Sequence, residues 1–189
     1  MLRRVHLILL ALLTVHTTAR GQSDASWEVR PIAGIAVPIA AHRNSFGNAA
    51  FAGVGSSIRL SASWDLVATF ATGSQTAKYP VADGHVHVLV YDAGVERMYR
   101  PSDRTTRGTW VPFTGLGVGG RANDFRSREL SSTSCYAAYG NAGIAYEKPR
   151  AALRLELRDN VFCYRSPVAP FNETGRNEAS IGFGAGIRF

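Results

Sequence analysis

The stretch Glu178-Ala-Ser-Ile-Gly-Phe-Gly-Ala-Gly-Ile-Arg-Phe189 decides the fold class of this chain. Apolar side chains recur there at every second position, with glycine or polar residues between them: Ala179, Ile181, Phe183, Ala185, Ile187 and Phe189. Successive side chains of a β-strand point to opposite faces, so the stretch predicts a long strand with one apolar face and one small or polar face. A soluble sheet could show the same alternation, but it seldom needs so long a strand that stops on an aromatic residue.

The first 21 residues have the features of a secretory signal peptide. Two arginines precede an apolar stretch from Val5 to Val15, and Ala19–Gly21 fits a small-residue cleavage site, which predicts cleavage between Gly21 and Gln22. The apolar stretch is too short for a spanning helix, which needs about 20 residues. An uncleaved N-terminal anchor is the alternative.

Cleavage there removes three arginines and no acidic residue, so the formal net charge falls from +7 to +4. Much of the basic character therefore belongs to the export signal, and the charge gives little support for binding to nucleic acid. We expect residues 22–189 to form one exported all-β domain, because their length suits one domain and helix-type periodicity is absent.

Eight strand-like segments recur along the mature chain, and the links between them alternate between short and long. Short or intermediate links are predicted at 61–65, 100–108 and 147–150, and longer polar ones at 38–50, 74–84, 122–134 and 163–177. Transmembrane β-barrels have short periplasmic turns and longer outer loops, and their strands need about 9–11 residues. The predicted strands are Trp27–Val37, Phe51–Ser61, Leu66–Gly73, His85–Tyr99, Thr109–Arg121, Cys135–Tyr146, Ala151–Phe162 and Glu178–Phe189.

The face opposite the apolar one collects charges of both signs. Leu153–Arg158 is the clearest case, since leucine there alternates with arginine or glutamate. An eight-stranded barrel is just wide enough for side chains to fill it, and an unpaired buried charge costs several kcal/mol, on the order of 3–5. We therefore predict ion pairs that fill the lumen, with a conducting or gated pore as the alternative. The predicted network is Arg30, Arg59, Asp92, Glu96, Arg154, Glu156, Arg158 and Arg188, and Glu178 lies on the same face.

The mature chain resembles the small eight-stranded outer-membrane β-barrels, which include the transmembrane domain of outer-membrane protein A and outer-membrane protein X. The export signal, the rhythm of short and long links and the stretch Gly182–Phe189 carry the resemblance. It implies a monomeric antiparallel up-and-down barrel in the bacterial outer membrane, surrounded by lipid that includes lipopolysaccharide. It also implies that Phe183, Ile187 and Phe189 belong to a signal for the barrel-assembly machinery. The family has many functions, so the resemblance predicts the fold more firmly than the function.

Cys135 and Cys163 flank the hairpin of the sixth and seventh predicted strands. Two cysteines in an exported chain favour a disulfide. A tight turn that pairs Glu147 with Arg150 sets Cys135 opposite Phe162, one residue short of Cys163. Two separate thiols are the alternative.

Asp159 is anomalous in the same hairpin, because strict alternation from Leu157 points its carboxylate at lipid. One β-bulge near Arg158–Asn160 would turn Asp159 away from the bilayer and bring the two cysteines opposite each other. We therefore predict a Cys135–Cys163 disulfide together with a bulge.

Catalysis and metal binding have little support in the sequence. His85 and His87 share a strand face without a third ligand nearby, so we interpret them as solvated histidines at the rim. We find no Gly-x-Ser-x-Gly motif and no His-x-Ser pair within a strand, so we expect neither an active site nor a cofactor. Interfacial belts are predicted from Trp27, Trp64, Tyr99 and Trp110 at the periplasmic rim, and from Tyr79, Phe125, Tyr136, Phe162 and Tyr164 at the outer rim.

The expected function is a non-enzymatic structural or surface-interaction role in the outer membrane. We name Arg121–Arg128 as a candidate contact for lipopolysaccharide phosphates, with solvated loop charge as the alternative. A channel for small solutes or hydrophobic compounds, a lipid-modifying barrel enzyme and a soluble periplasmic β-sandwich are the rival interpretations.

Overall fold

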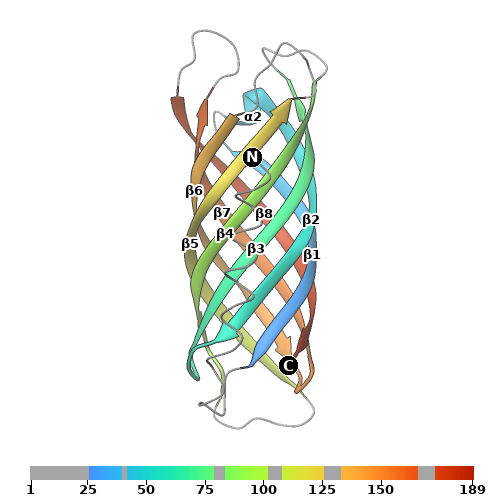
Figure 1. Cartoon of the computed structure of the whole chain (residues 1–189), viewed down its shortest axis with the longest axis vertical. Coiled ribbons are helices and arrows are strands. Elements are labelled where there is room, and N and C mark those ends of the chain that lie inside the picture. The colour runs from blue at the N-terminus through green and yellow to red at the C-terminus, as the bar shows by residue number, and fades with distance from the viewer. Residues whose placement is uncertain (1–25, 40–41, 79–83, 102–107, 126–132, 166–172) are drawn as a thin grey trace, which may run out of the picture.

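The computed structural model is a closed antiparallel barrel of eight strands, so the predicted fold class is confirmed (Figure 1). Each strand pairs with the next in sequence, and β8 closes the barrel on β1. A four-residue helix, α2 (His42–Ser45), connects the first two strands. The strands are β1 (Trp27–Ile39), β2 (Phe46–Arg59), β3 (Trp64–Ala77), β4 (Gly84–Met98), β5 (Thr109–Phe125), β6 (Thr133–Glu147), β7 (Ala151–Arg165) and β8 (Glu173–Arg188).

The structure describes residues 26–39, 42–78, 84–101, 108–125, 133–165 and 173–189, without the side chains of 164, 165, 173 and 174. Within these ranges, no helix is long and apolar enough to cross a lipid bilayer. The predicted cleavage position between Gly21 and Gln22 lies outside them.

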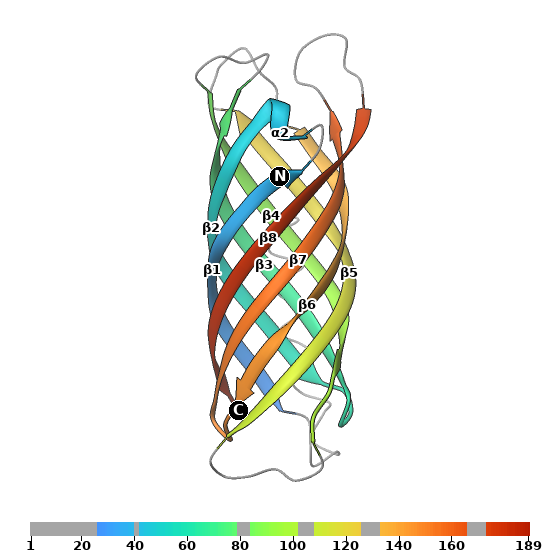
Figure 2. The ribbon, with the colours of Figure 1, turned by 180° about the vertical axis from the view of Figure 1, so that it is seen from behind.

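The two ends of the barrel differ, and we name them by what they carry. The turn rim carries the C-terminus and the links after β2 and β6, and the loop rim carries α2 (Figures 1 and 2). At the turn rim the backbone N–H of Leu60 donates to the Trp64 carbonyl at 2.9 Å, and that of Lys148 donates to the Ala151 carbonyl at 2.8 Å. Each of these hydrogen bonds connects the two ends of one link and so closes a tight turn.

Side chains alternate between the exterior and the lumen along every strand. Val54, Phe70 and Leu116 are at least half exposed on the exterior, whereas Val67 and Val111 are almost fully buried in the lumen. The apolar exterior is the arrangement expected of a barrel in lipid. The alternation also assigns the faces of β3 and β5, which were ambiguous in the sequence because threonine, glycine and alanine dominate them.

The strands extend further toward the loop rim than the sequence predicted. β2 begins at Phe46 and β5 ends at Phe125, so much of each expected outer loop is strand or helix. Inward-facing polar residues such as Gln75, Asn123 and Glu178 explain the difference, because they resemble loop composition while they continue the two-residue period. The predicted loops that the structure shortens are 38–50, 74–84, 122–134 and 163–177.

The β6–β7 register differs from the prediction, and the expected β-bulge is absent. Glu147 pairs with Ala152 rather than Arg150, because the tight turn lies one residue further along the chain and is closed by the hydrogen bond from the Lys148 N–H to the Ala151 carbonyl. The register then continues unbroken through Asp159 and Asn160 on both neighbouring strands. Asp159 is consequently exposed on the exterior, in the orientation that the bulge was meant to avoid.

The Cys135–Cys163 disulfide is present, with Cα atoms 5.6 Å apart. The regular pairing of β6 with β7 ends at Ala137 and Phe162, just before the two cysteines. They join beyond the end of the β6–β7 ladder, while Cys135 stays paired with Arg121 on β5 and Cys163 with Gly175 on β8. The sequence therefore predicted the bond correctly, but for the wrong geometric reason.

The predicted belt of exposed aromatic side chains is confirmed at the turn rim, whereas part of the prediction is wrong at the loop rim. Trp64 and Trp110 are 45% and 62% exposed on the exterior, and Tyr136 is 89% exposed toward the loop rim. Phe125 and Phe162 were predicted to join Tyr136, but they are buried inside the barrel. Tyr79 and the side chain of Tyr164 lie outside the described residues.

Candidate functional site: ion-pair layers across the lumen

The lumen contains three layers of charged and amide side chains, and Glu96 and Arg154 form the centre of the middle one. Arg154 on β7 donates from Nη1 to Oε2 of Glu96 on β4 at 2.9 Å. Asn141 on β6 donates to the other Glu96 oxygen at 2.8 Å. The guanidinium of Arg154 also lies 3.5 Å above the centre of the Phe113 ring. The Glu96 carboxylate, 1% exposed, is thus enclosed by donors from two other strands.

Arg158 completes the middle layer on the side toward the loop rim. It donates to Asp92 Oδ2 at 2.7 Å and to Glu156 Oε1 at 2.8 Å. Asn141 reaches Glu156 at 3.1 Å and so connects the two halves of the layer. The Arg158 guanidinium covers the Tyr139 ring, 4.0 Å from its centre.

The layer at the turn rim gathers three arginines around Glu147. Arg100 donates from Nε to Glu147 Oε2 at 3.2 Å, Arg188 donates to the other oxygen, and Arg59 Nη2 lies 3.5 Å away. Arg100 also donates to Asp65 on β3, so it spans the mouth of the barrel from β3 to β6.

Glu28 connects this rim layer to the rest of the lumen. Its carboxylate accepts from Arg188 Nε at 2.9 Å and from Arg30 Nη1 at 3.0 Å. Arg30 is the member of the predicted network that lies between the rim layer and the middle layer.

The layer at the loop rim is built around Arg121. Its guanidinium donates to Glu178 Oε1 at 2.7 Å, to Gln75 Oε1 at 2.8 Å and to Asn123 Oδ1 at 3.2 Å. It also covers the Phe162 ring at 4.4 Å. Arg121 was named as a surface contact for lipopolysaccharide, and its 4% exposure inside the lumen makes that prediction wrong for this residue. Residues 126–128 of the same segment lie outside the described residues.

His42 closes the loop rim from α2. Its ring lies 4.8 Å from that of Phe46 and 5.2 Å from that of Phe162, and Nε2 is 3.8 Å from Oε2 of Glu178. Burial, together with the charges of Arg121 and Arg176, lowers the pKa of His42 to about 3. The imidazole is therefore neutral at physiological pH.

Apolar clusters pack beside the charged layers, which the sequence analysis did not predict. Between the turn rim and the middle layer, Phe113 packs with Met98, Val111 and Ala145. A second cluster near the loop rim contains Phe46, Ala77, Val86, Val88 and Phe125.

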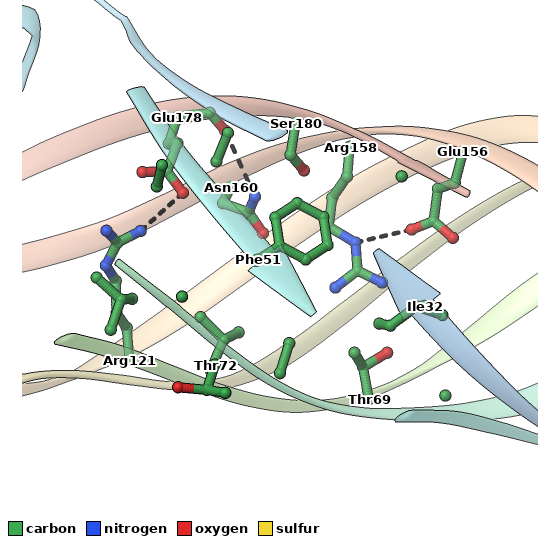
Figure 3. A pocket seen from close by; sticks show the side chains of 18 of the residues that line it. Ile32, Phe51, Thr69, Thr72, Arg121, Glu156, Arg158, Asn160, Glu178 and Ser180 are labelled. Atoms are coloured by element: carbon green, nitrogen blue, oxygen red, sulfur yellow. Dashed lines mark hydrogen bonds and ion pairs between the residues drawn. The ribbon is translucent and has the colours of Figure 1, made fainter. Parts of the chain in front are cut away.

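A cavity of about 100 Å³ lies between the middle layer and the loop-rim layer. Figure 3 shows the Arg121–Glu178 pair on one side of it and the Arg158–Glu156 pair on the other, with Phe51 between them. Its wall from β1 to β4 is mainly apolar, and its wall from β7 and β8 is mainly polar.

The structure places every residue of the predicted lumen network in at least one ion pair. The pairs involve Arg30, Arg59, Asp92, Glu96, Arg154, Glu156, Arg158 and Arg188. Sequence reasoning missed Glu28, Asp65, Arg100, Arg121, Asn141 and Glu147 as partners. Alternation in the sequence places Glu28 on the inward face with Arg30, although the predicted network omits it. Arg100 gave no such signal, because it follows β4 and folds back into the mouth.

The remaining predicted positions lie on the outer surface. Phe183, Ile187 and Phe189 are 53%, 61% and 78% exposed, and their role as an assembly signal stays a prediction. His85 is exposed and His87 half-buried. Among the described residues, no three histidine, cysteine or acidic side chains are grouped as metal ligands.

Comparison with solved structures shows the fold. No family model matches the chain, and no curated protein matches it at the threshold for a significant match. OprG from Pseudomonas aeruginosa, an outer membrane protein, superposes with a TM-score of 0.61 at 15% identity, over 89% of this chain and 98% of that one. Neisserial surface protein A gives a TM-score of 0.62 at 11% identity, over 88% and 100%.

A third solved structure is Ail, the attachment invasion locus protein of Yersinia pestis, in complex with the heparin analogue sucrose octasulfate. It gives a TM-score of 0.51 at 15% identity, over 87% of this chain and 97% of that one. The chain thus has the fold of the small outer-membrane β-barrels.

Proposed function

We propose that this protein is a bacterial outer-membrane barrel with a closed lumen, which has a structural or surface-interaction role and no catalytic activity. The observation that carries the proposal is that ion pairs cross the lumen at three levels. Arg154 and Glu96 join β7 to β4, Arg121 and Glu178 join β5 to β8, and Arg100 joins the mouth to β3 and β6.

Each level resists opening for the same physical reason. Separating a buried ion pair leaves a charge without a partner at low dielectric, which costs about 3–5 kcal/mol. A continuous water path would require such separation at all three levels. The apolar cluster around Phe113, between the turn-rim and middle layers, adds a further barrier to ions.

Planar bilayers test whether the lumen is closed. We expect the purified barrel to give no discrete conductance steps, whereas R100A/R121A/R154A, which loses one arginine from each layer, should leak. Steady single-channel steps from the unaltered protein would contradict the proposal. The triple variant must keep the far-ultraviolet circular dichroism of a barrel for the comparison to count.

A channel for small hydrophobic compounds is the second candidate function. The apolar wall of the cavity between the middle and loop-rim layers favours it. Uptake of an apolar dye into vesicles tests this candidate. If the barrel speeds uptake, and if Ala71→Phe, which fills the cavity, slows it again, the result supports this candidate over the first.

We further propose that the turn rim faces the periplasm and that the loop rim meets lipopolysaccharide. Arg43 and Lys78 are exposed near α2, and Lys78 Nζ donates to the Arg43 carbonyl at 3.3 Å, which groups two cations there. The sulfated ligand of Ail is an anionic sugar, as lipopolysaccharide is. Cell fractionation tests the location, and binding to lipopolysaccharide micelles, weakened by R43Q/K78Q, tests the contact.

The barrel-assembly machinery remains the expected partner during insertion, and a monomer remains the expected state. Phe189→Ala should reduce the amount in outer-membrane fractions while in vitro folding into micelles is unchanged. An equal loss in both assays would assign Phe189 to stability instead.

A further inference from the structure

The turn rim contains a second cavity, of about 230 Å³, that the closed-lumen proposal does not use. Arg59, Arg100, Lys148 and Arg188 line it, and Glu147 is the one acidic side chain among its described lining residues. Lys148 and the neighbouring Pro149 are exposed, so the cavity lies at the surface of the rim.

The charges around this cavity do not balance. Glu147 is shared by Arg59, Arg100 and Arg188. The two acids behind the wall, Asp65 and Glu28, are also engaged: Asp65 pairs with Arg100, and Glu28 is divided between Arg188 and Arg30. Among the described residues, four arginines, Arg30 included, thus share these three carboxylates, and Lys148 is a further lining cation whose Nζ lies 5.7 Å from the centre of the Tyr146 ring.

The middle layer has the opposite balance. There Arg154 and Arg158 face Glu96, Glu156 and Asp92. Among the described residues, the excess positive charge thus lies on the turn-rim side of the middle layer, and the cavity is where it meets solvent. A concave surface with charge of one sign concentrates ions of the other sign.

The remaining polar groups of the cavity suit an oxyanion. The hydroxyl-bearing residues Ser26 and Thr109 line it together with the guanidinium groups. Guanidinium forks bind phosphate oxygens in pairs, and a lysine adds a point charge. A chloride ion would use one or two of these donors, whereas a phosphate can use several at once.

We propose that the turn-rim cavity is a binding site for a phosphate group, held by Arg59, Arg188 and Lys148. Arg100 forms the wall toward the lumen and stays paired with Asp65 and Glu147. The phosphate can come from free inorganic phosphate or from the headgroup of an anionic lipid in the adjoining leaflet. The site does not depend on whether the lumen conducts.

Titration of the refolded full chain in zwitterionic micelles with inorganic phosphate tests the site. Backbone and arginine Nε resonances are followed by NMR at constant ionic strength, with sodium chloride as the reference. We expect saturable shifts that converge on Ser26, Thr109 and Arg188. Shifts that rise linearly with phosphate, or that chloride reproduces, would overturn the proposal.

Variants of the turn between β6 and β7 provide a matched pair. Lys148→Gln should weaken phosphate binding about three- to tenfold, because it removes one lining cation. Arg150→Gln removes the same charge two residues away, from an exposed side chain that does not line the cavity, and should change the affinity less than twofold. If the two variants weaken phosphate binding equally, the binding comes from the general positive charge of the surface and not from the cavity, which overturns the proposal.

A second titration identifies the source of the phosphate. Short-chain phosphatidylglycerol replaces inorganic phosphate, with short-chain phosphatidylcholine as the neutral-headgroup control. The site is supported if either phosphate source binds saturably and if Lys148→Gln weakens that binding. The source with the higher affinity is then the ligand of the site. Arg59→Gln is the second variant, since its guanidinium makes the longest of the three contacts with Glu147, at 3.5 Å. If neither source saturates, the proposal fails.

Discussion

Glu96 accepts hydrogen bonds from Arg154 on β7 and Asn141 on β6, although its own strand is β4. A single carboxylate therefore connects three strands across the lumen. Its stabilising effect depends on its partners, because removing one member of a buried pair leaves the other charge uncompensated.

We predict that Glu96→Ala lowers the free energy of unfolding by about 3–5 kcal/mol, because Arg154 then remains buried with Glu156 as its remaining carboxylate. Urea titration in micelles, followed by tryptophan fluorescence, measures the change. Replacing both members, in E96M/R154M, should recover most of the loss. If the double variant is as unstable as the single one, the loss of stability does not come from the uncompensated charge of Arg154, and this explanation is wrong.

His42 makes the barrel sensitive to acid at the loop rim. Its pKa is about 3 in the folded protein, against an ordinary value of about 6.5 in the unfolded chain. Between these values the unfolded chain binds a proton that the folded barrel does not. The contribution of His42 to stability is therefore complete above pH 6.5 and is lost progressively as the pH falls toward 3.

We accordingly predict that His42→Gln flattens the fall in unfolding free energy between pH 6.5 and pH 4. His87→Gln, which changes a half-buried histidine on the exterior, should leave the slope as it is. Urea titrations at four pH values measure both slopes. Parallel slopes for His42→Gln and the unaltered chain would show that His42 titrates normally.

At the scale of the strands, close contact between rings and glycines determines how neighbouring strands fit together. A Cβ atom on Gly94 would clash with the Tyr139 hydroxyl and with the Leu116 carbonyl. Gly140, on the exterior of β6, has no atom within 4 Å of the same position. Close packing thus requires a glycine at position 94, whereas the space around Gly140 would accept a side chain.

Gly94→Ala should destabilise the barrel by about 1–3 kcal/mol, because the Tyr139 ring or the β5 backbone must move. Gly140→Ala should stay within about 0.5 kcal/mol of the unaltered chain. Thermal or urea unfolding of the two variants measures the contrast. Equal losses would mean that strand propensity, rather than the Tyr139 contact, governs both positions.

The disulfide acts on the hairpin of β6 and β7 beyond the end of its ladder. Replacing both cysteines, in C135S/C163S, should lower the unfolding free energy by about 2–4 kcal/mol, since the bond constrains the unfolded chain. Reduction of the unaltered protein should reproduce this value. The unreduced, denatured chain should gain no adducts on thiol alkylation, and a gain of two would contradict the bond.

The whole molecule is one closed sheet, because β8 pairs with β1 from Glu28–Arg188 to Ile39–Asn177. Closure leaves no strand edge exposed, so the barrel should unfold as one unit. We predict different gel mobility for boiled and unboiled samples. Ile35→Pro removes a backbone donor from β1 and should abolish the difference, whereas Ile35→Val should keep it. An unboiled sample that migrates as the boiled one does would contradict a stable closed barrel.

The sequence by itself determined the number of strands, their order and the faces of most of them. The alternation of Leu153–Arg158 is a local property, visible without knowledge of any partner, and the tight links after β2 and β6 are local as well. These features suffice to predict an eight-stranded barrel with a charged lumen and an apolar exterior. The pairing of Cys135 with Cys163 followed from the hairpin and from the number of cysteines.

The tertiary structure alone decided the register of β6 on β7, the partners of each charge and the inward turn of Phe125 and Phe162. Register depends on which residues form the tight turn, here Lys148–Ala151 rather than Glu147–Arg150, and composition does not specify that position. Arg154 and Glu96 are 58 residues apart and meet only because the sheet closes. Sequence periodicity reports which face a side chain occupies, and closure decides what it meets there.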